Sequence, residues 1–372
     1  MQKKRTPLKR TVAHTHRKRK QTMAASATPF ACLFLVVVAV LSSGAGAQWT
    51  ASQLSQARNH LAAATAGDLA IFAGGITDEL TPRSTVDIYN IASNSWSTTT
   101  LSEARHSLAG ASACGRFALF AGGTASTGPS DNVDMFDARG VHTTASLSVA
   151  RTNLAGASAN GLVMFGGGKG PAGVPVSTVD IYNTATNVWS TASLSRSRSM
   201  LAATSVGGLV LFAGGDYYGL FVDIYNTANA SWTTARLSQS RYSLAATSVA
   251  DVALFAGGTS APATVSSVVD IYNATSNTWS TASLSMARDR VAATTVGPLA
   301  IFAGGYSNVD SNNRGPKDVV DIFDSRTGQW TTSTIIPQAY DMAATSLRGN
   351  RGFFAGGWTG PLSTAAVRIY SA

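Results

Sequence analysis

From residue 48 onward, the chain consists of short runs in which apolar residues are continuous or alternate with polar ones, separated by clusters of Gly, Asn, Ser and Thr. Such runs are typical of β-strands, and the polar clusters between them are typical of turns. No stretch after Gln48 has a helical period long enough to predict a substantial helix. The pattern therefore predicts an all-β protein.

The runs recur as one unit that appears seven times. In order, the unit reads Arg-x-x-Leu-Ala-Ala-Thr, an apolar run ending Phe-Ala-Gly-Gly, then Val-Asp-Ile-Tyr-Asn, then Trp-Ser-Thr-Ala-x-Leu-Ser. The first glycines of the pairs, 43 to 52 residues apart, are Gly74, Gly122, Gly167, Gly214, Gly257, Gly304 and Gly356. Each unit predicts a four-stranded antiparallel sheet, which cannot bury both faces alone. Seven sheets packed around an axis do bury them, so we predict a seven-bladed β-propeller.

The tryptophan of the fourth strand indicates how the ring closes. Its position is filled by Trp49, Trp96, His142, Trp189, Trp232, Trp279 and Trp330. The repeats thus begin at residue 48 with a fourth strand and end, at residues 367–372, with a third. We predict that the strand around Trp49 pairs with this last strand and completes the seventh blade.

Two charged residues repeat in six of the seven units. The arginines are Arg58, Arg105, Arg151, Arg198, Arg241 and Arg288, and the aspartates are Asp87, Asp134, Asp180, Asp223, Asp270 and Asp321. Both series lapse in the last unit, where Ala339 and Arg368 take their places. Because both positions lie at one end of a blade, our hypothesis is that each Arg reaches across the glycine pair to the Asp of its own blade. The alternative is that the Arg caps loops while the Asp is solvated.

Two residues after the repeated Arg, the units differ. These positions, which we expect to surround the mouth of the central channel, are His60, Ser107, Asn153, Met200, Ser243, Arg290 and Asp341. The loops after the glycine pairs share this face and present Tyr217, Tyr218, Tyr306 and Trp358. Aromatic residues and Arg are enriched at binding hot spots, so we predict that these eleven residues bind a partner. The alternatives are that the aromatics pack within blades and that Arg290 and Asp341 only pair with each other.

The order of glycine pair, Tyr and Trp within each unit resembles the kelch repeat, over about 325 residues. The departures are local, such as His142 in a Trp position. The resemblance implies a kelch-type propeller, a fold that serves both binding modules and a few enzymes. Galactose-oxidase-like kelch enzymes need a copper site built from His, Tyr and a crosslinked Cys. Only His60, His106 and His142 follow the leader, so we expect no metal and no cofactor.

The positive charge of the chain is concentrated at its beginning. There are 28 Lys and Arg against 19 Asp and Glu, a net charge of +9, but nine of the basic residues lie within the first 20 positions. The remainder carries equal numbers of both signs. A nucleic-acid binder needs positive charge on its folded surface, so we expect no nucleic-acid partner.

Residues 1–47 have the features of an export signal. A basic head precedes the apolar block 30–41, and small residues lead to a cleavage point after Ala47. The alternative is an uncleaved signal anchor that tethers the propeller outside a membrane. We therefore divide the chain into a leader, 1–47, and a propeller, 48–372, which is secreted or membrane-anchored. Cys114 is then the one Cys of the mature chain, so no intramolecular disulfide is expected, and the sequons at Asn229 and Asn273 could accept glycans.

Together these features predict an exported, monomeric kelch-repeat binding module. We expect it to recognise a protein or a glycan on the face that carries the glycine-pair loops, and to have no enzymatic activity. The alternative is a carbohydrate-active kelch enzyme, either galactose-oxidase-like or a sugar isomerase. Such an enzyme needs acid, base or metal groups that converge in the mouth, where the sequence offers only His60, Arg290 and Asp341.

Overall fold

The computed structural model describes residues 48–113, 115–216, 219–309, 314–347 and 350–372. They belong to one compact unit, Val38–Ala372. The predicted leader, Cys114, Tyr217 and Tyr218 lie outside the described residues. Within the described ranges, no helix has the length and apolar character needed to cross a membrane.

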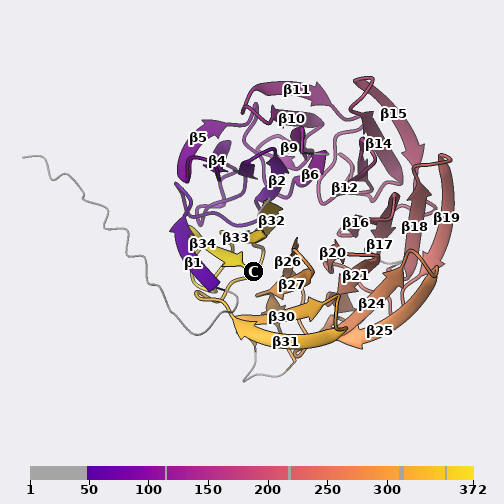
Figure 1. Cartoon of the computed structure of the whole chain (residues 1–372). Helices are drawn as coiled ribbons and strands as arrows, with labels where there is room; N and C mark the ends of the chain where they lie inside the picture. The colour runs from indigo at the N-terminus through magenta and orange to yellow at the C-terminus, as the bar shows by residue number, and fades with distance from the viewer. Residues whose placement is uncertain (1–47, 114, 217–218, 310–313, 348–349) are drawn as a thin grey trace, which may run out of the picture. The chain divides into compact units, whose positions relative to one another are not determined.

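The described strands form seven four-stranded sheets, numbered here as blades 1 to 7 in chain order, and the strands of each blade are given from the axis outward (Figure 1). Blade 1 contains β2 (Ala62–Ala66), β3 (Leu69–Ala73), β4 (Thr85–Asn90) and β5 (Ser95–Thr100). Blade 2 contains β6 (Ala109–Ala113), β7 (Phe117–Ala121), β10 (Asn132–Asp137) and β11 (His142–Ser146). Blade 3 contains β12 (Ala155–Ala159), β13 (Leu162–Gly166), β14 (Thr178–Asn183) and β15 (Val188–Ser193).

The remaining blades repeat this arrangement. Blade 4 contains β16 (Ala202–Val206), β17 (Leu209–Ala213), β18 (Phe221–Asn226) and β19 (Ser231–Arg236). Blade 5 contains β20 (Ala245–Val249), β21 (Val252–Ala256), β24 (Val268–Asn273) and β25 (Thr278–Ser283). Blade 6 contains β26 (Ala292–Val296), β27 (Leu299–Ala303), β30 (Val319–Asp324) and β31 (Gln329–Thr334). Blade 7 contains β32 (Ala343–Leu347), β33 (Arg351–Ala355), β34 (Ala366–Ser371) and β1 (Gln48–Gln53).

All pairings within the blades are antiparallel, and the innermost strands pack one against the next until β32 meets β2. The predicted all-β, seven-bladed propeller is therefore confirmed. Short two-stranded ribbons extend the loops after three glycine pairs: β8 (Thr124–Ala125) with β9 (Gly128–Pro129), β22 (Thr259–Ser260) with β23 (Thr264–Val265), and β28 (Tyr306–Ser307) with β29 (Gly315–Pro316). These loops share one face with the connections between blades, which we call the top face.

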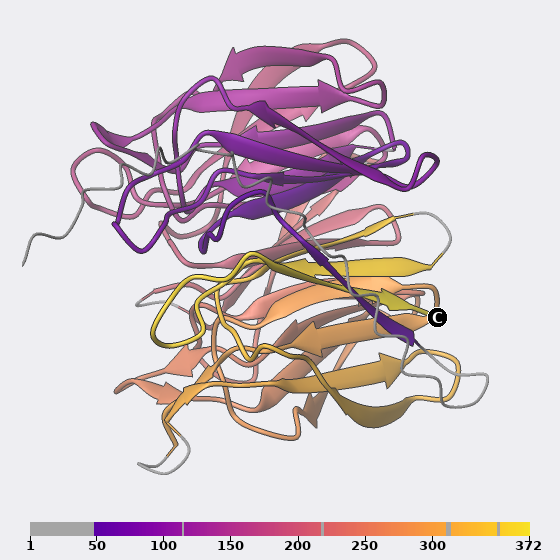
Figure 2. The same cartoon turned by 90° about the vertical axis from the view of Figure 1, so that its left-hand side faces the viewer.

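The two ends of the described chain meet in blade 7, as predicted. Strand β1 pairs with β34 along its whole length, with Trp49 opposite Tyr370 (Figures 1 and 2). The Trp49 ring lies 5.0 Å from Tyr370 and 5.8 Å from Phe354. The first strand of the propeller thus supplies the outer edge of its last blade.

The hydrophobic core consists of apolar layers between neighbouring blades and not of one central cluster. The second strands are almost entirely buried, and the phenylalanine of each one packs on the neighbouring blade. Phe72 of blade 1 and Phe353 of blade 7, for example, share one apolar cluster with their ring centres 6.2 Å apart. The innermost strands carry small residues because adjacent blades converge there. Each blade therefore depends on its neighbours for burial.

The glycine pairs allow neighbouring blades to approach closely. Gly122 has φ +63°, and a Cβ on it would lie 2.5 Å from the carbonyl oxygen of Arg151 in the next blade. The N–H of Gly123 donates to that same oxygen at 2.9 Å. Both the backbone conformation and the contact therefore require glycine at position 122.

Replacing Gly122 with alanine should lower the free energy of unfolding by about 3 kcal/mol, which combines ~1–2 kcal/mol for the left-handed backbone with ~1–3 kcal/mol for the clash. Gly328 is a matched control because its φ is +70° and nothing lies within 4 Å of the Cβ it lacks. Gly328→Ala should lose only the backbone contribution, ~1–2 kcal/mol. Urea denaturation of both variants measures the difference, and equal losses would show that the inter-blade approach is unimportant.

Candidate functional site

Six buried ion pairs hold the top ends of the blades. They are Arg58–Asp87, Arg105–Asp134, Arg151–Asp180, Arg198–Asp223, Arg241–Asp270 and Arg288–Asp321. The Arg151–Asp180 contact, for example, is 2.6 Å long, and its arginine side chain is entirely buried. Each pair joins an arginine to the aspartate of its own blade, which confirms our hypothesis. Burial lowers the pKa of all six guanidinium groups, and the attraction of the aspartates opposes this shift.

Each aspartate also fixes the connection from the preceding blade. In blade 3, the second carboxylate oxygen of Asp180 accepts the N–H of Ser148 at 2.9 Å. In blade 2, the guanidinium of Arg105 donates to the carbonyl oxygens of Gly122 and Asn132 at 2.7 and 2.6 Å. These bonds set the position of the chain segment that leads to the channel mouth.

Blade 7 makes the corresponding link with its polarity reversed. Ala339 replaces the arginine, and Arg368 replaces the aspartate. The Arg368 guanidinium donates to the carbonyl oxygen of Ile336, in the connection from blade 6. At the same place in the connection to blade 6, the backbone N–H of Ser285 donates to the carboxylate of Asp321. The repeated arginine and the repeated aspartate are both absent from blade 7 because each needs the other when its charge is buried.

His142 has a structural role in its tryptophan position. Its ring stacks on Phe136 with centres 4.6 Å apart, and its Nε2 lies 2.7 Å from Asp134. Histidine therefore provides an aromatic packing surface and a polar contact to Asp134 in this position.

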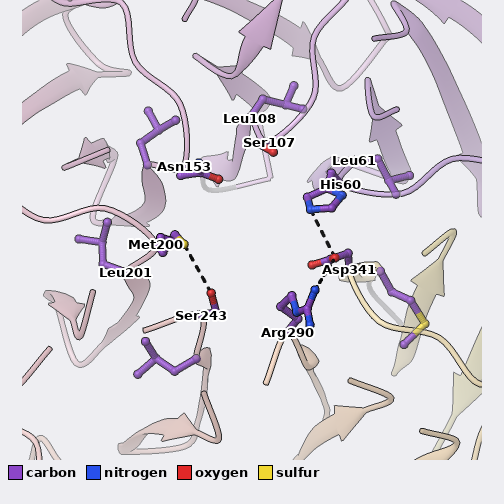
Figure 3. A pocket seen from close by; sticks show the side chains of 13 residues that line it. His60, Leu61, Ser107, Leu108, Asn153, Met200, Leu201, Ser243, Arg290 and Asp341 are labelled. Carbon is purple, nitrogen blue, oxygen red and sulfur yellow. Dashed lines mark hydrogen bonds and ion pairs between the residues drawn. The ribbon is translucent and has the colours of Figure 1, made fainter. Parts of the chain in front are cut away.

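The seven variable positions lie together around one pocket on the axis. This axial pocket of about 240 Å³ is lined by His60, Ser107, Asn153, Met200, Ser243, Arg290 and Asp341, which we call the mouth residues, together with the apolar residues that follow six of them (Figure 3). Every blade contributes one mouth residue, as the sequence comparison predicted.

The backbone of the mouth residues forms a closed ring of hydrogen bonds. Each mouth residue donates its N–H to the carbonyl oxygen of the mouth residue in the preceding blade, at distances between 2.9 Å for Ser107 and 3.4 Å for Asp341. His60 completes the circle by donating to Asp341 at 3.3 Å. All seven residues have φ between +50° and +54°. The ring therefore joins every blade to the next without using a side chain.

The mouth has a charged side and a neutral side. His60 Nε2 lies 3.3 Å from Asp341 Oδ2, and Arg290 Nη1 lies 3.7 Å from the same oxygen (Figure 3). Burial raises the pKa of Asp341, whereas the nearby His60 and Arg290 lower it by a smaller amount. On the opposite side, Ser243 Oγ lies 3.8 Å from Met200 Sδ. The structure therefore contains the predicted pair of Arg290 and Asp341, and His60 also pairs with Asp341.

A second pocket of about 280 Å³ opens beside the charged side. This side pocket shares His60, Arg290 and Asp341 with the axial pocket, and its other lining residues are Asn59, Ile76, Leu80, His106, Tyr340 and Trp358. It lies across the junction of blades 7 and 1. The bond from Ser363 N–H to Asp78 Oδ1, 2.6 Å long, joins the loops of these two blades.

The structure separates the predicted loop aromatics. Trp358 lines the side pocket, whereas Tyr306 packs behind Arg290, whose guanidinium carbon lies 5.0 Å from the Tyr306 ring centre and 4.3 Å from that of Tyr340. Tyr217 and Tyr218 fall outside the described residues. The sequence analysis missed Tyr340 and His106, which immediately precede a mouth residue. That position also varies between units, and this variation would have identified them.

A copper site needs a set of donor side chains that lie close together. Among the described residues, no group of three or more His, Cys, Asp or Glu side chains could hold a metal ion. The copper centre of galactose-oxidase-like enzymes therefore does not fit this mouth as described, and we derive no step through a metal.

No protein-family model matches this chain, and no curated protein matches it either. The seven-bladed propeller fold rests on the structure itself, and the kelch assignment rests on the repeat motifs.

Proposed function

We propose that this chain is an exported, monomeric kelch-type propeller that binds a protein or glycan partner at the mouth of its top face. The apolar block and small residues of the leader support export. The balanced charge of residues 48–372 argues against nucleic acid as the partner.

The observation that carries this proposal is the left-handed conformation of all seven mouth residues. This conformation costs a residue other than glycine ~1–2 kcal/mol, less for Asn and Asp. The ring of hydrogen bonds uses peptide groups only, so glycine would close it equally well. Seven side chains are nevertheless kept where they cost stability and face a pocket. Strain of this kind is typical of functional sites, because selection for ligand contacts offsets it.

Glycine substitutions at the mouth test the proposal without opening the ring. In the full chain, His60→Gly, Arg290→Gly and Asp341→Gly together remove the charged side while favouring the same backbone conformation. Wild-type and variant proteins are applied to a glycan array. In a second assay they are immobilised and exposed to proteins of the extracellular fluid. We expect the wild type to retain a partner and the variant to lose it, with no fall in melting temperature.

The matched control is Ala230→Gly with Ala250→Gly. These alanines also have left-handed backbones, φ +54° and +48°, but lie in turns on the opposite face. The control should bind as the wild type does. Equal binding by the mouth variant and the wild type would overturn the proposal.

A second candidate is an enzyme acting on a carbohydrate, such as a sugar isomerase. The observation that favours it is Asp341, whose pKa is raised by burial in a pocket and which lies beside His60, an arrangement typical of acid–base catalysis. Chemical conversion of a bound sugar, measured by NMR, would support this candidate. Saturable binding without conversion would support the binding module.

A further inference from the structure

We infer that the side pocket between blades 7 and 1 holds a neutral pyranose, recognised through two adjacent hydroxyl groups. This inference rests on the proposed function and names the ligand class of the same face. It follows from the polar floor of the pocket, its aromatic wall and its charge balance.

The lining of the side pocket offers both a hydrogen-bond acceptor, Asp341, and donors, His60 and Arg290. Asp341 Oδ2 is buried and accepts no hydrogen bond within the described part of the chain. His60 Nε2 and Arg290 Nη1 lie 3.3 and 3.7 Å from it, but neither contact is a hydrogen bond. One hydroxyl can donate to Asp341 while its neighbour accepts from Arg290 or His60.

The charge balance favours an uncharged ligand. Arg290 lies between two carboxylates, with its Nε 3.2 Å from Asp289 and its Nη1 3.7 Å from Asp341. A ligand carboxylate or phosphate would meet these two acids, and a ligand cation would meet Arg290. A purely apolar group would leave the buried oxygen of Asp341 without a partner, which disfavours its binding.

The walls fit the apolar face of a sugar ring. The Trp358 indole N–H donates to the carbonyl oxygen of Gly360 at 2.6 Å, and the Tyr340 ring packs against the Tyr306 ring with centres 5.4 Å apart, so both rings are held in place. Leu80, 74% exposed and with φ +55°, forms part of the rim. A leucine rarely adopts this backbone, so its position at the pocket indicates a contact worth the strain. The volume of about 280 Å³ suits one sugar residue, and the adjoining axial pocket leaves room for the next.

An array of neutral and sialylated oligosaccharides, probed with the full chain, tests the inference. We expect binding to neutral glycans whose terminal pyranose has two free adjacent hydroxyls. Trp358→Ala and Asp341→Asn should each weaken binding at least about tenfold, as loss of a hot spot does, while Trp358→Phe restores most of it. Arg326→Ala, which breaks an exposed ion pair with Asp324 in the turn between β30 and β31, on the face opposite the mouth, should bind as the wild type does. Melting curves verify that each variant is folded.

The outcomes separate this inference from the proposed function. Preference for sialylated glycans, or equal loss with Arg326→Ala and Asp341→Asn, would overturn the inference. A silent array, together with capture of a protein that the glycine variant of the mouth cannot retain, would also overturn it but leave the proposed function standing. Absence of any partner that depends on the mouth would remove both.

Discussion

Replacing Thr50 and Ser52 together with proline should lower the free energy of unfolding by about 3–5 kcal/mol, the combined cost of lost ladder bonds and lost Trp49 packing. Leu54, directly after β1, donates its N–H to the carbonyl oxygen of Ala365, directly before β34, at 2.8 Å. Because antiparallel ladders alternate, the N–H groups of Ser52 and Thr50 point to the same side. The prolines remove both donors, so β1 should detach and leave blade 7 with three strands.

Ala51→Pro is the matched control, because its N–H points away from β34 and an outer strand tolerates proline there. Urea denaturation of the full-length variants measures the effect. Small-angle scattering should show expansion of the double variant and unchanged dimensions for the control. A double variant as stable as the control would mean that β1 does not close the ring.

Arg151→Ala should destabilise the propeller by about 3–5 kcal/mol, the usual cost of leaving a buried charge without its partner. The Asp180 carboxylate would remain inside the blade with the Ser148 N–H as its other contact. The carbonyl oxygen of Phe165 would lose its 3.0 Å bond from the same guanidinium. Denaturant unfolding measures the loss.

Two controls identify burial as the cause. Arg326→Ala breaks an exposed pair with Asp324, 2.7 Å long, and should leave the denaturation midpoint unchanged. Arg151→Met with Asp180→Leu removes both charges and should lose clearly less than Arg151→Ala, because no unpaired charge remains. If the double variant is the less stable one, attraction within the pair outweighs the cost of burying it.

Features that repeat along the chain could be predicted from the sequence. The glycine pairs give the number of blades, and the phase of the tryptophan series places Trp49 in the last blade. The ion pairs could be inferred because Ala339 and Arg368 replace both partners in one unit. Such inferences succeed because each unit must solve the same packing problem as its neighbours.

Features that depend on contacts between different blades could not be predicted from the repeats. The side pocket combines Leu80 and Trp358, which are far apart in sequence and adjacent only because the ring closes. Tyr306 and Tyr340 hold Arg290 between blades, a contact that no repeat motif indicates. The left-handed backbone of the mouth was hidden because none of its residues is glycine.

Amide hydrogen exchange at the mouth residues tests most directly whether joining the two chain ends holds the binding face together. In the wild-type protein, we expect these seven amides to exchange as slowly as those of the innermost strands. In the Thr50→Pro, Ser52→Pro variant, protection should disappear first at His60, whose N–H joins blade 1 to blade 7, and at Asp341, whose N–H joins blade 7 to blade 6. Rapid exchange at the mouth of the wild type, or full protection in the variant, would contradict the account.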